Sequence, residues 1–148
     1  MEPILFSSKS HSDDRGSVSF TNELNLTNVV RTYKVQNELI KTVRAWHGHK
    51  IEEKWISVEE GQFLVCAVHI DDFNKPSKNI KIHKFTLTPT DGILYVPNNY
   101  ANGAMNLTEN NTIRYFSSLL LNESLTDDYR FDSKFWNPWS EFNPNFYE

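Results

Sequence analysis

An all-β fold is the class that the sequence predicts. Short runs rich in β-branched and aromatic residues recur along the chain, and several alternate apolar with polar side chains, as half-buried strands do. Gly, Pro, Asn and Asp residues, which favour turn conformations, separate the runs. Seven or more short strands in one small domain predict a sandwich or barrel whose interior can hold a ligand.

The individual elements follow from these runs. Strands are expected within seven segments: 17–20, 28–35, 41–50, 53–70, 81–89, 92–97 and 112–121. Turns are expected at DDRG (13–16), EEG (59–61), NKPS (74–77), TPTDG (88–92) and PNNYANG (97–103). The EEG turn divides 53–70 into two strands. Residues 122–136 have some helical character, but their aromatic content and irregular spacing argue against a regular helix there.

Length and composition limit the possible partners. The 148 residues fit a single domain, 1–148, with 39% hydrophobic and 14% aromatic residues to build its core. A net charge of -4 and the lack of a long basic run argue against nucleic acid or a membrane surface as a partner. A few converging arginines and lysines could still hold a small anion such as a phosphate group.

Cysteine usage and the N-terminus indicate the compartment. Cys66 is the only cysteine, so no intrachain disulfide can form. The opening residues MEPILFSSKS lack the features of a signal peptide, and no apolar run reaches the roughly 20 residues that span a bilayer. The protein is therefore expected to be cytoplasmic.

Two histidines lie one residue apart in the expected strand 41–50. Residues two apart on a strand point to the same face, so His47 and His49 project together, and Gly48 leaves the opposite face clear. Such a pair can bind a metal ion, transfer protons, or lie on the surface as ordinary polar residues. The surrounding residues decide between these alternatives.

Two motifs resemble those of the cupin family, whose members are double-stranded β-helix, or jelly-roll, barrels. The first motif contains His47, His49, position 54 and Gly61, and the second contains Pro97, position 102 and Asn106, at matching spacing. The resemblance implies a cupin-type jelly-roll barrel. In metal-binding cupins the two histidines and the residues at positions 54 and 102 are the ligands.

Two of those four ligands are replaced here, by Lys54 and Asn102. An ammonium group cannot coordinate a cation and repels it, and an amide is a poor transition-metal ligand beside imidazole. The sequence therefore predicts a site without a metal and without any other cofactor.

Within the cupins, segments along nearly the whole chain resemble the dTDP-4-dehydrorhamnose 3,5-epimerases. DDRG at 13–16, RAWH at 44–47 and YRFDSKFWNPW at 129–139 each resemble a segment of that family. The middle of the chain also resembles the dTDP-sugar 3,4-ketoisomerases, through RTY at 31–33 and RAWHGHK at 44–50. Both resemblances imply a nucleotide-linked 4-keto-6-deoxyhexose, carried on dTDP, as the substrate.

The implied chemistry begins with removal of a proton from the carbon beside the ketone. An imidazole, with an unperturbed pKa of about 6.5, can accept that proton near neutral pH. We predict that His47 is the base, with His49 as a second catalytic histidine. A fixed cation, Lys54 or Arg44, would stabilise the resulting enolate. The candidates for substrate binding are Arg15, Arg31, Arg44 and Asn102.

The chain departs from the epimerase pattern at the proton donor. Leu120 and Leu121 stand where that family carries its acid tyrosine, five or six residues beyond Tyr115. Tyr33 and Tyr115 are the candidates to replace it if their hydroxyl groups reach the pocket. The candidates for the carboxylate that orients the histidine are Asp13 and Asp132.

Other conspicuous residues have simpler explanations. The four tryptophans are expected mainly to fill the core or an interface, although a thymine ring could stack on one of them: Trp46, Trp55, Trp136 and Trp139. Four glutamates read as solvated charges at turns: Glu52, Glu53, Glu59 and Glu60.

Epimerisation at C3 and C5, or at one of these carbons, is the favoured reaction, in the synthesis of a cell-surface polysaccharide. Ketoisomerisation is the close alternative. The loss of the second-motif histidine and of the acid tyrosine leaves open a non-catalytic cupin that binds a sugar nucleotide. A metal-dependent oxygenase would need ligands other than Lys54 and Asn102. Because the resembling families usually pair through β-strands, a homodimer is expected. The resemblance implies that Arg15 contacts phosphate or substrate and reaches toward the partner subunit, whereas the local sequence alone equally predicts a turn arginine in solvent.

Overall fold

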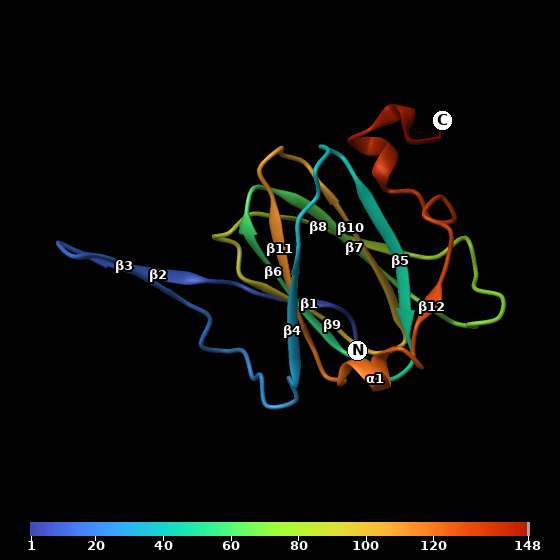
Figure 1. Ribbon diagram of the computed structural model, residues 1–148, viewed down its shortest axis with the longest axis horizontal. Helices are drawn as coiled ribbons and strands as arrows, with labels where there is room; N and C mark the ends of the chain where they lie inside the picture. The colour runs from blue at the N-terminus through green and yellow to red at the C-terminus, as the bar shows by residue number, and fades with distance from the viewer. Residues whose placement is uncertain (148) are drawn as a thin grey trace.

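Two five-stranded antiparallel sheets lie face to face and form the body of the protein (Figure 1). The first sheet has the order β1 (Ile4–Phe6), β9 (Ile93–Val96), β6 (Lys54–Glu60), β11 (Thr112–Ser117) and β4 (Arg31–Val35). The second has the order β12 (Tyr129–Arg130), β5 (Val43–His49), β10 (Tyr100–Asn106), β7 (Phe63–His69) and β8 (Ile82–Leu87). The computed structural model describes residues 1–147 and confirms the predicted all-β jelly roll.

Helical structure is sparse in the described part of the chain. It consists of α1 (Leu121–Ser124), η1 (Trp139–Glu141) and η2 (Pro144–Tyr147). Only the start of the segment 122–136 is helical, as its irregular pattern indicated. Within residues 1–147, no helix is long and apolar enough to cross a membrane.

The space between the sheets is filled by alternate residues of the facing strands. Ile56 and Val58 of β6, Phe63 and Val65 of β7, and Ile113 of β11 belong to this core and are at most 3% exposed. This alternation is what the strand patterns predicted. The core fills one part of the interior and leaves the part beside Tyr33 and Tyr115 to the cavity described below.

A second apolar cluster covers the outer face of the second sheet. Leu64, Cys66 and Val68 of β7 point to this face and pack with Trp46, Trp136 and Trp139 at its centre. The indole nitrogen of Trp46 donates to the backbone oxygen of Trp136 at 3.1 Å, which ties β5 to the C-terminal segment. Because β7 is covered on both faces, its sequence is a continuous apolar run. The predicted core role of the tryptophans is confirmed.

The segment 97–103 was predicted to be a turn, and most of this prediction is wrong. Tyr100–Asn106 is β10, a fully buried strand in the middle of the second sheet. Asn and Gly have low strand propensity, but here Asn106 accepts from Thr42 and donates to Leu39 and Thr108. Gly103 is needed because a Cβ there would lie 2.5 Å from the Cβ of Ala45. Tertiary contacts therefore override local propensity.

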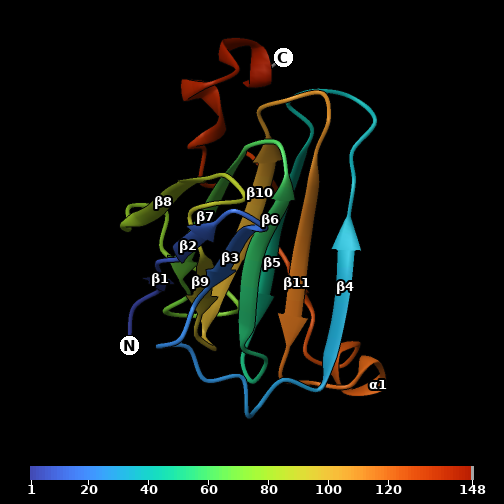
Figure 2. The same cartoon turned by 90° about the vertical axis from the view of Figure 1, so that its left-hand side faces the viewer.

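A two-stranded hairpin, β2 (Lys9–Asp13) and β3 (Gly16–Phe20), projects away from the two sheets (Figures 1 and 2). We call residues 9–20 the arm. Every residue of β2 and all but the last of β3 are exposed. The predicted DDRG turn forms its tip, with Gly16 at φ 137°. An isolated hairpin of this kind is only marginally stable in water.

Candidate active site

A cavity of about 330 Å³ lies between the sheets and receives side chains from both of them and from α1. Eight of the nine predicted site residues line it: Arg31, Tyr33, Arg44, His47, His49, Lys54, Asn102 and Tyr115. Arg15 is not among the lining residues. Six further lining residues were not singled out as site residues from the sequence: Val35, Leu121, Ser124, Leu125, Asp128 and Arg130.

Strand geometry explains why these residues meet. Arg31 and Tyr33 are two apart on β4, so both face the interior. Arg44 and His47 are three apart on β5, which would normally place them on opposite faces. The pairing of β5 with β10 shifts by one residue between them, with Asn102 opposite His47 and Ala104 opposite Arg44. This extra residue in β5 returns Arg44 to the cavity side.

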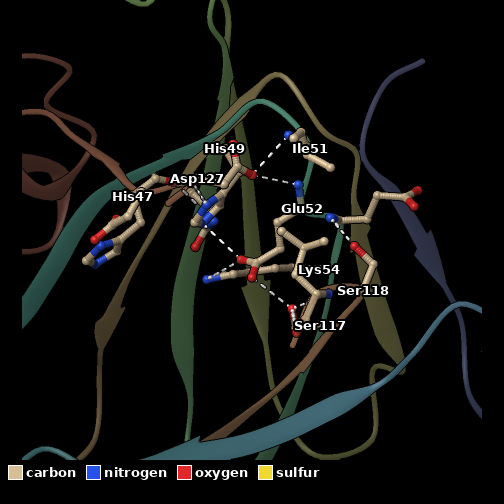
Figure 3. A network of polar contacts seen from close by, with 12 residues as sticks. His47, His49, Ile51, Glu52, Lys54, Ser117, Ser118 and Asp127 are labelled. Carbon is tan, nitrogen blue, oxygen red and sulfur yellow. Dashed lines mark hydrogen bonds and ion pairs between the residues drawn. The ribbon is translucent and has the colours of Figure 1, made fainter. Parts of the chain in front are cut away.

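His49 has both ring nitrogens facing protein atoms (Figure 3). Its Nδ1–H donates to the backbone oxygen of Asp127 at 2.8 Å, and its Nε2 lies 3.2 Å from Oε2 of Glu52. The two atoms form an ion pair only when the imidazole carries a second proton, and neither has a hydrogen-bond partner among residues 1–147. Burial and Lys54 lower the pKa of His49, while Glu52 opposes them. The Nε2 atom is fully buried, so the ring presents no free nitrogen to a ligand.

Glu52 was predicted to be a solvated turn charge, and this is wrong. It is 1% exposed and lies at the centre of the polar network in Figure 3. Oε1 accepts from Ser117 Oγ at 2.8 Å and from Arg31 Nη2 at 3.3 Å, and Oε2 lies 3.5 Å from Lys54 Nζ. Burial raises the pKa of Glu52, but Lys54 and His49 outweigh it and lower the pKa below its usual value.

Glu53 also differs from its predicted role, because it is half-buried and accepts a hydrogen bond from the hydroxyl of Tyr95. Glu59 and Glu60, in contrast, are exposed, as predicted.

Asp127 holds the loop between β5 and β6 in place. Its carboxylate accepts hydrogen bonds from three successive backbone N–H groups, those of Lys50 at 2.9 Å, Ile51 at 3.0 Å and Glu52 at 2.8 Å. Its backbone oxygen is the acceptor for His49. One residue of the 121–130 segment thus fixes both the His49 ring and the position of Glu52.

His47 is the histidine whose ring nitrogens face the cavity without a hydrogen-bond partner among residues 1–147. Burial, followed by the charges of Lys54 and Arg130, lowers its pKa to about 4. Asp128 lines the same cavity and opposes this shift, while its carboxylate accepts from Arg130 Nε at 3.1 Å. His47 is therefore neutral at pH 7 and can accept a proton.

Tyr33 and Lys54 form a pair on the wall opposite His47. Lys54, 7% exposed, donates from Nζ to the hydroxyl oxygen of Tyr33 at 3.0 Å. Because an ammonium group can only donate, the hydroxyl hydrogen of Tyr33 is left to point elsewhere, and it meets no acceptor in the described chain. Tyr115 stacks on Tyr33 with 5.2 Å between ring centroids, and burial raises the pKa of the Tyr115 phenol.

The arginines add positive charge to the cavity. Arg44 Nε donates to Asn37 Oδ1 at 2.7 Å, which leaves its two terminal nitrogens without a partner among residues 1–147. Arg31 is held by Glu52 and by the backbone oxygen of Leu119. Asn102 donates to the backbone oxygen of His47 at 3.3 Å. An anionic group such as a phosphate would meet several donors here.

Three predicted residues lie elsewhere. Arg15 sits at the tip of the arm, where its guanidinium pairs with Asp13 at 2.6 Å and its side chain is 85% exposed. Asp132 is exposed and caps the backbone of Lys134. The carboxylates at the histidines are Glu52 and Asp128 rather than Asp13 or Asp132. Their acidic side chains gave no periodic signal in the sequence, because both lie in loops.

No group of three or more His, Cys, Asp or Glu side chains among residues 1–147 is placed to hold a metal ion. Lys54, which lines the cavity, contributes an ammonium group that is paired with Glu52.

Neither a protein-family model nor a curated protein matches the sequence. Solved structures do match. The 3,4-ketoisomerase from Helicobacter canadensis has a TM-score of 0.68 at 17% identity, over 91% of this chain and 95% of that chain. The dTDP-4-dehydrorhamnose 3,5-epimerase from Bacillus anthracis, with TDP and pyrophosphate bound, has a TM-score of 0.75 at 19% identity, over 93% of this chain and 84% of that chain.

A single-site mutant of the 3,4-ketoisomerase from Thermoanaerobacterium thermosaccharolyticum, in complex with TDP-4-keto-6-deoxyglucose, has a TM-score of 0.67 at 16% identity and covers 99% of this chain and 98% of that chain. The similarity to both kinds of enzyme agrees with the resemblance found in the motifs. The chain therefore has the cupin-type jelly-roll fold shared by dTDP-4-dehydrorhamnose 3,5-epimerases and sugar 3,4-ketoisomerases.

Proposed function

We propose that the protein is an isomerase that acts on a dTDP-linked 4-keto-6-deoxyhexose by removing a proton from the carbon beside the ketone. The observation that carries the proposal is the arrangement of His47 across one cavity from Tyr33 and Lys54. His47 belongs to the second sheet, and Tyr33 and Lys54 belong to the first. A base and a proton donor therefore approach a ligand from opposite sides.

His47 is the base in this proposal. Its ring nitrogens are free, and its low pKa of about 4 keeps it in the accepting form at neutral pH. A weak base removes a carbon-bound proton only if the enolate is stabilised. Lys54 and Arg44 line the same cavity and supply that charge in a partly desolvated site. His49 has a positioning role: its Nε2 lies 3.2 Å from Glu52, the residue that pairs with Lys54, and it does not touch the reacting carbon.

Tyr33 is the proton donor on the opposite side. Its oxygen accepts from Lys54, so its own hydrogen is directed to the ligand. The ammonium group also stabilises the phenolate that forms when the proton leaves. Delivery of a proton to the face opposite the base inverts the carbon, which is epimerisation. This arrangement favours the epimerase over the ketoisomerase.

Ketoisomerisation is the second candidate function. It needs a proton shuttle between neighbouring atoms rather than an acid on the far side. The observation in its favour is the agreement in chain length. The alignment covers 95% and 98% of the two ketoisomerases, but 84% of the B. anthracis epimerase.

The substrate class is inferred from the cavity and from bound ligands in the similar structures. The cavity presents four cationic side chains, those of Arg31, Arg44, Lys54 and Arg130, against the single lining carboxylate of Asp128. Solved structures of this fold hold TDP or a TDP-linked keto sugar.

A homodimer is also part of the proposal, because the arm is exposed and Arg15 at its tip is accessible to a second subunit.

The test is hydrogen exchange in deuterated water with dTDP-4-keto-6-deoxyglucose, followed by NMR of the sugar. Deuterium at C3 and C5 indicates double epimerisation, deuterium at C3 alone indicates the single-carbon reaction, and a 3-keto product indicates ketoisomerisation. His47→Gln should abolish exchange, whereas His69→Gln, an exposed histidine on β7, should not. Binding of TDP without any exchange would mean that the protein is a non-catalytic binder and would refute the proposal.

Tyr33→Phe separates proton removal by His47 from proton delivery by Tyr33. Removal of the acid should lower epimer formation by about 10²- to 10⁴-fold while His47 still exchanges the proton it removes. Tyr115→Phe removes the stacked hydroxyl group that does not contact Lys54, and it should lose less activity. Equal losses in both variants would contradict the role given to Tyr33.

A further inference from the structure

Two leucines lie exposed at the rim of the cavity. Leu121 begins α1 and is 58% exposed, and Leu125 follows its end and is 69% exposed. Both line the cavity. They are four residues apart on one helical turn, so their side chains lie next to each other on one face. Large apolar side chains held together in water beside a polar cavity indicate a binding surface.

The leucine pair is held in a fixed position. The backbone N–H of Leu125 donates to the oxygen of Leu121 at 3.1 Å. The backbone N–H of Leu120 donates to Glu123 Oε1 at 3.1 Å, which caps the turn. At the two sides, the oxygen of Leu119 accepts from Arg31, and Asp127 holds the loop of residues 50–52. Little conformational freedom is lost when a ligand contacts such a surface.

Few apolar side chains line the other walls of the cavity. Val35 and Tyr33 are half-buried, Tyr115 is buried, and the two tyrosine rings stack on each other in the interior. All four tryptophans are at most 4% exposed, and none lines the cavity. A nucleoside diphosphate sugar needs cations for its phosphates, polar groups for its sugar and an apolar surface for its base. The first two are present in the interior, and the leucine pair is the exposed apolar surface at the rim.

We propose that Leu121 and Leu125 form the subsite for the pyrimidine base of the nucleotide-sugar substrate. This rests on the proposed function and adds the base subsite to it. Aliphatic side chains stabilise a bound ring through the hydrophobic effect and dispersion, and they form no hydrogen bonds with the edge of the base. Recognition of the base should therefore be loose, and TDP should bind only about fourfold more tightly than dUDP, from which it differs by one methyl group.

The test is calorimetric titration of the full chain with two probes, TDP and inorganic pyrophosphate. Leu121→Ser and Leu125→Ser should each weaken TDP binding by about tenfold, because each removes apolar contact with the base. Pyrophosphate lacks the base, so its affinity should stay within twofold of wild type in both variants. Leu120→Ser is the matched control, since Leu120 is 51% exposed and does not line the cavity. It should leave both affinities unchanged.

Several results would overturn this assignment. TDP affinity within twofold of wild type in both cavity variants would show that the base binds elsewhere. A parallel loss of pyrophosphate binding would show that the substitutions disturb the phosphate site. A change in sedimentation of the variants would assign the leucines to a subunit interface. Wild-type protein that binds pyrophosphate but not TDP would instead refute the proposed substrate class, which keeps the two failures distinct.

Discussion

Replacement of Glu52 by Gln tests whether one buried carboxylate holds the site together. The side chain keeps its size and loses its charge. In the wild type, Glu52 is 1% exposed and lies within 3.5 Å of charged nitrogens of Lys54 and Arg31. The Ser117 hydroxyl can still donate to the amide oxygen, so that bond should survive. The variant therefore isolates the charge.

The expected loss of stability follows from the charged side chains that remain once Glu52 is neutral. Lys54 is 7% exposed and would remain buried without its anion. Removal of one partner from a buried ion pair typically costs about 3 to 5 kcal/mol. The Arg31 side chain is 22% exposed and can regain water, which places the expected loss at the lower end, about 3 kcal/mol. A domain of this size has roughly 5 to 15 kcal/mol of stability, so the variant should fold.

Urea denaturation at pH 7 measures the effect. Glu52→Gln combined with Lys54→Met removes both charges and should recover at least half of the loss, since no buried charge is then unpaired. Glu60→Gln, at an exposed position, is the control and should change stability by less than about 0.5 kcal/mol. A Glu52→Gln protein within about 1 kcal/mol of wild type, or a double variant no more stable than it, would refute the reasoning.

The pH dependence of this difference has a fixed sign. The folded-state pKa of Glu52 lies below its ordinary value of 4.5. Its stabilisation is therefore fully present above pH 4.5 and is lost as the pH falls through the lower folded-state value. The stability gap between wild type and Glu52→Gln should close only in that acidic range.

Three further predictions concern other parts of the molecule. The pH profile of kcat/KM should fall on its acid side with a pKa of about 4, because His47 must be neutral, and an acid limb near 6.5 would contradict its role as base. Asp127→Ala leaves three backbone N–H groups without an acceptor and should cost about 3 kcal/mol or more in urea denaturation, whereas Asp127→Asn, which keeps one oxygen, should cost less. Gly103→Ala places a methyl group 2.5 Å from the Cβ of Ala45 and should cost about 1 to 3 kcal/mol, seen as a lower Tm, and an unchanged Tm would show that the sheet can move to admit it.

Local patterns predicted much of the fold and the site. The period of two in RTYKV places Arg31 and Tyr33 on the same face, and the same period in the VRAWHGH strand brings His47 and His49 together. Both pairs line the cavity, as expected. Side-chain direction on a strand is set by the backbone alone, so a sequence carries it without knowledge of the partner strands.

Loop residues escaped prediction because their environment depends on distant segments. Glu52 reads as a turn charge, and it is buried because Ser117, Arg31 and Lys54 close around it. In the sequence, Asp127 is one more acidic residue in a polar segment. In the structure, its carboxylate accepts hydrogen bonds from three backbone N–H groups that lie 75 to 77 residues earlier. No local periodicity encodes such contacts.

The sequence by itself determined the all-β class and the shared face of residues two apart on a regular strand, because each depends on residue type and on spacing along one strand. Only the tertiary structure decided which histidine has free nitrogens. His47 and His49 are equivalent in the pattern, and they differ because Asp127 and Glu52 occupy the ring of one and leave the other to the cavity. The different roles of these two imidazoles are thus set by the side chains and backbone groups that contact each ring in the folded protein.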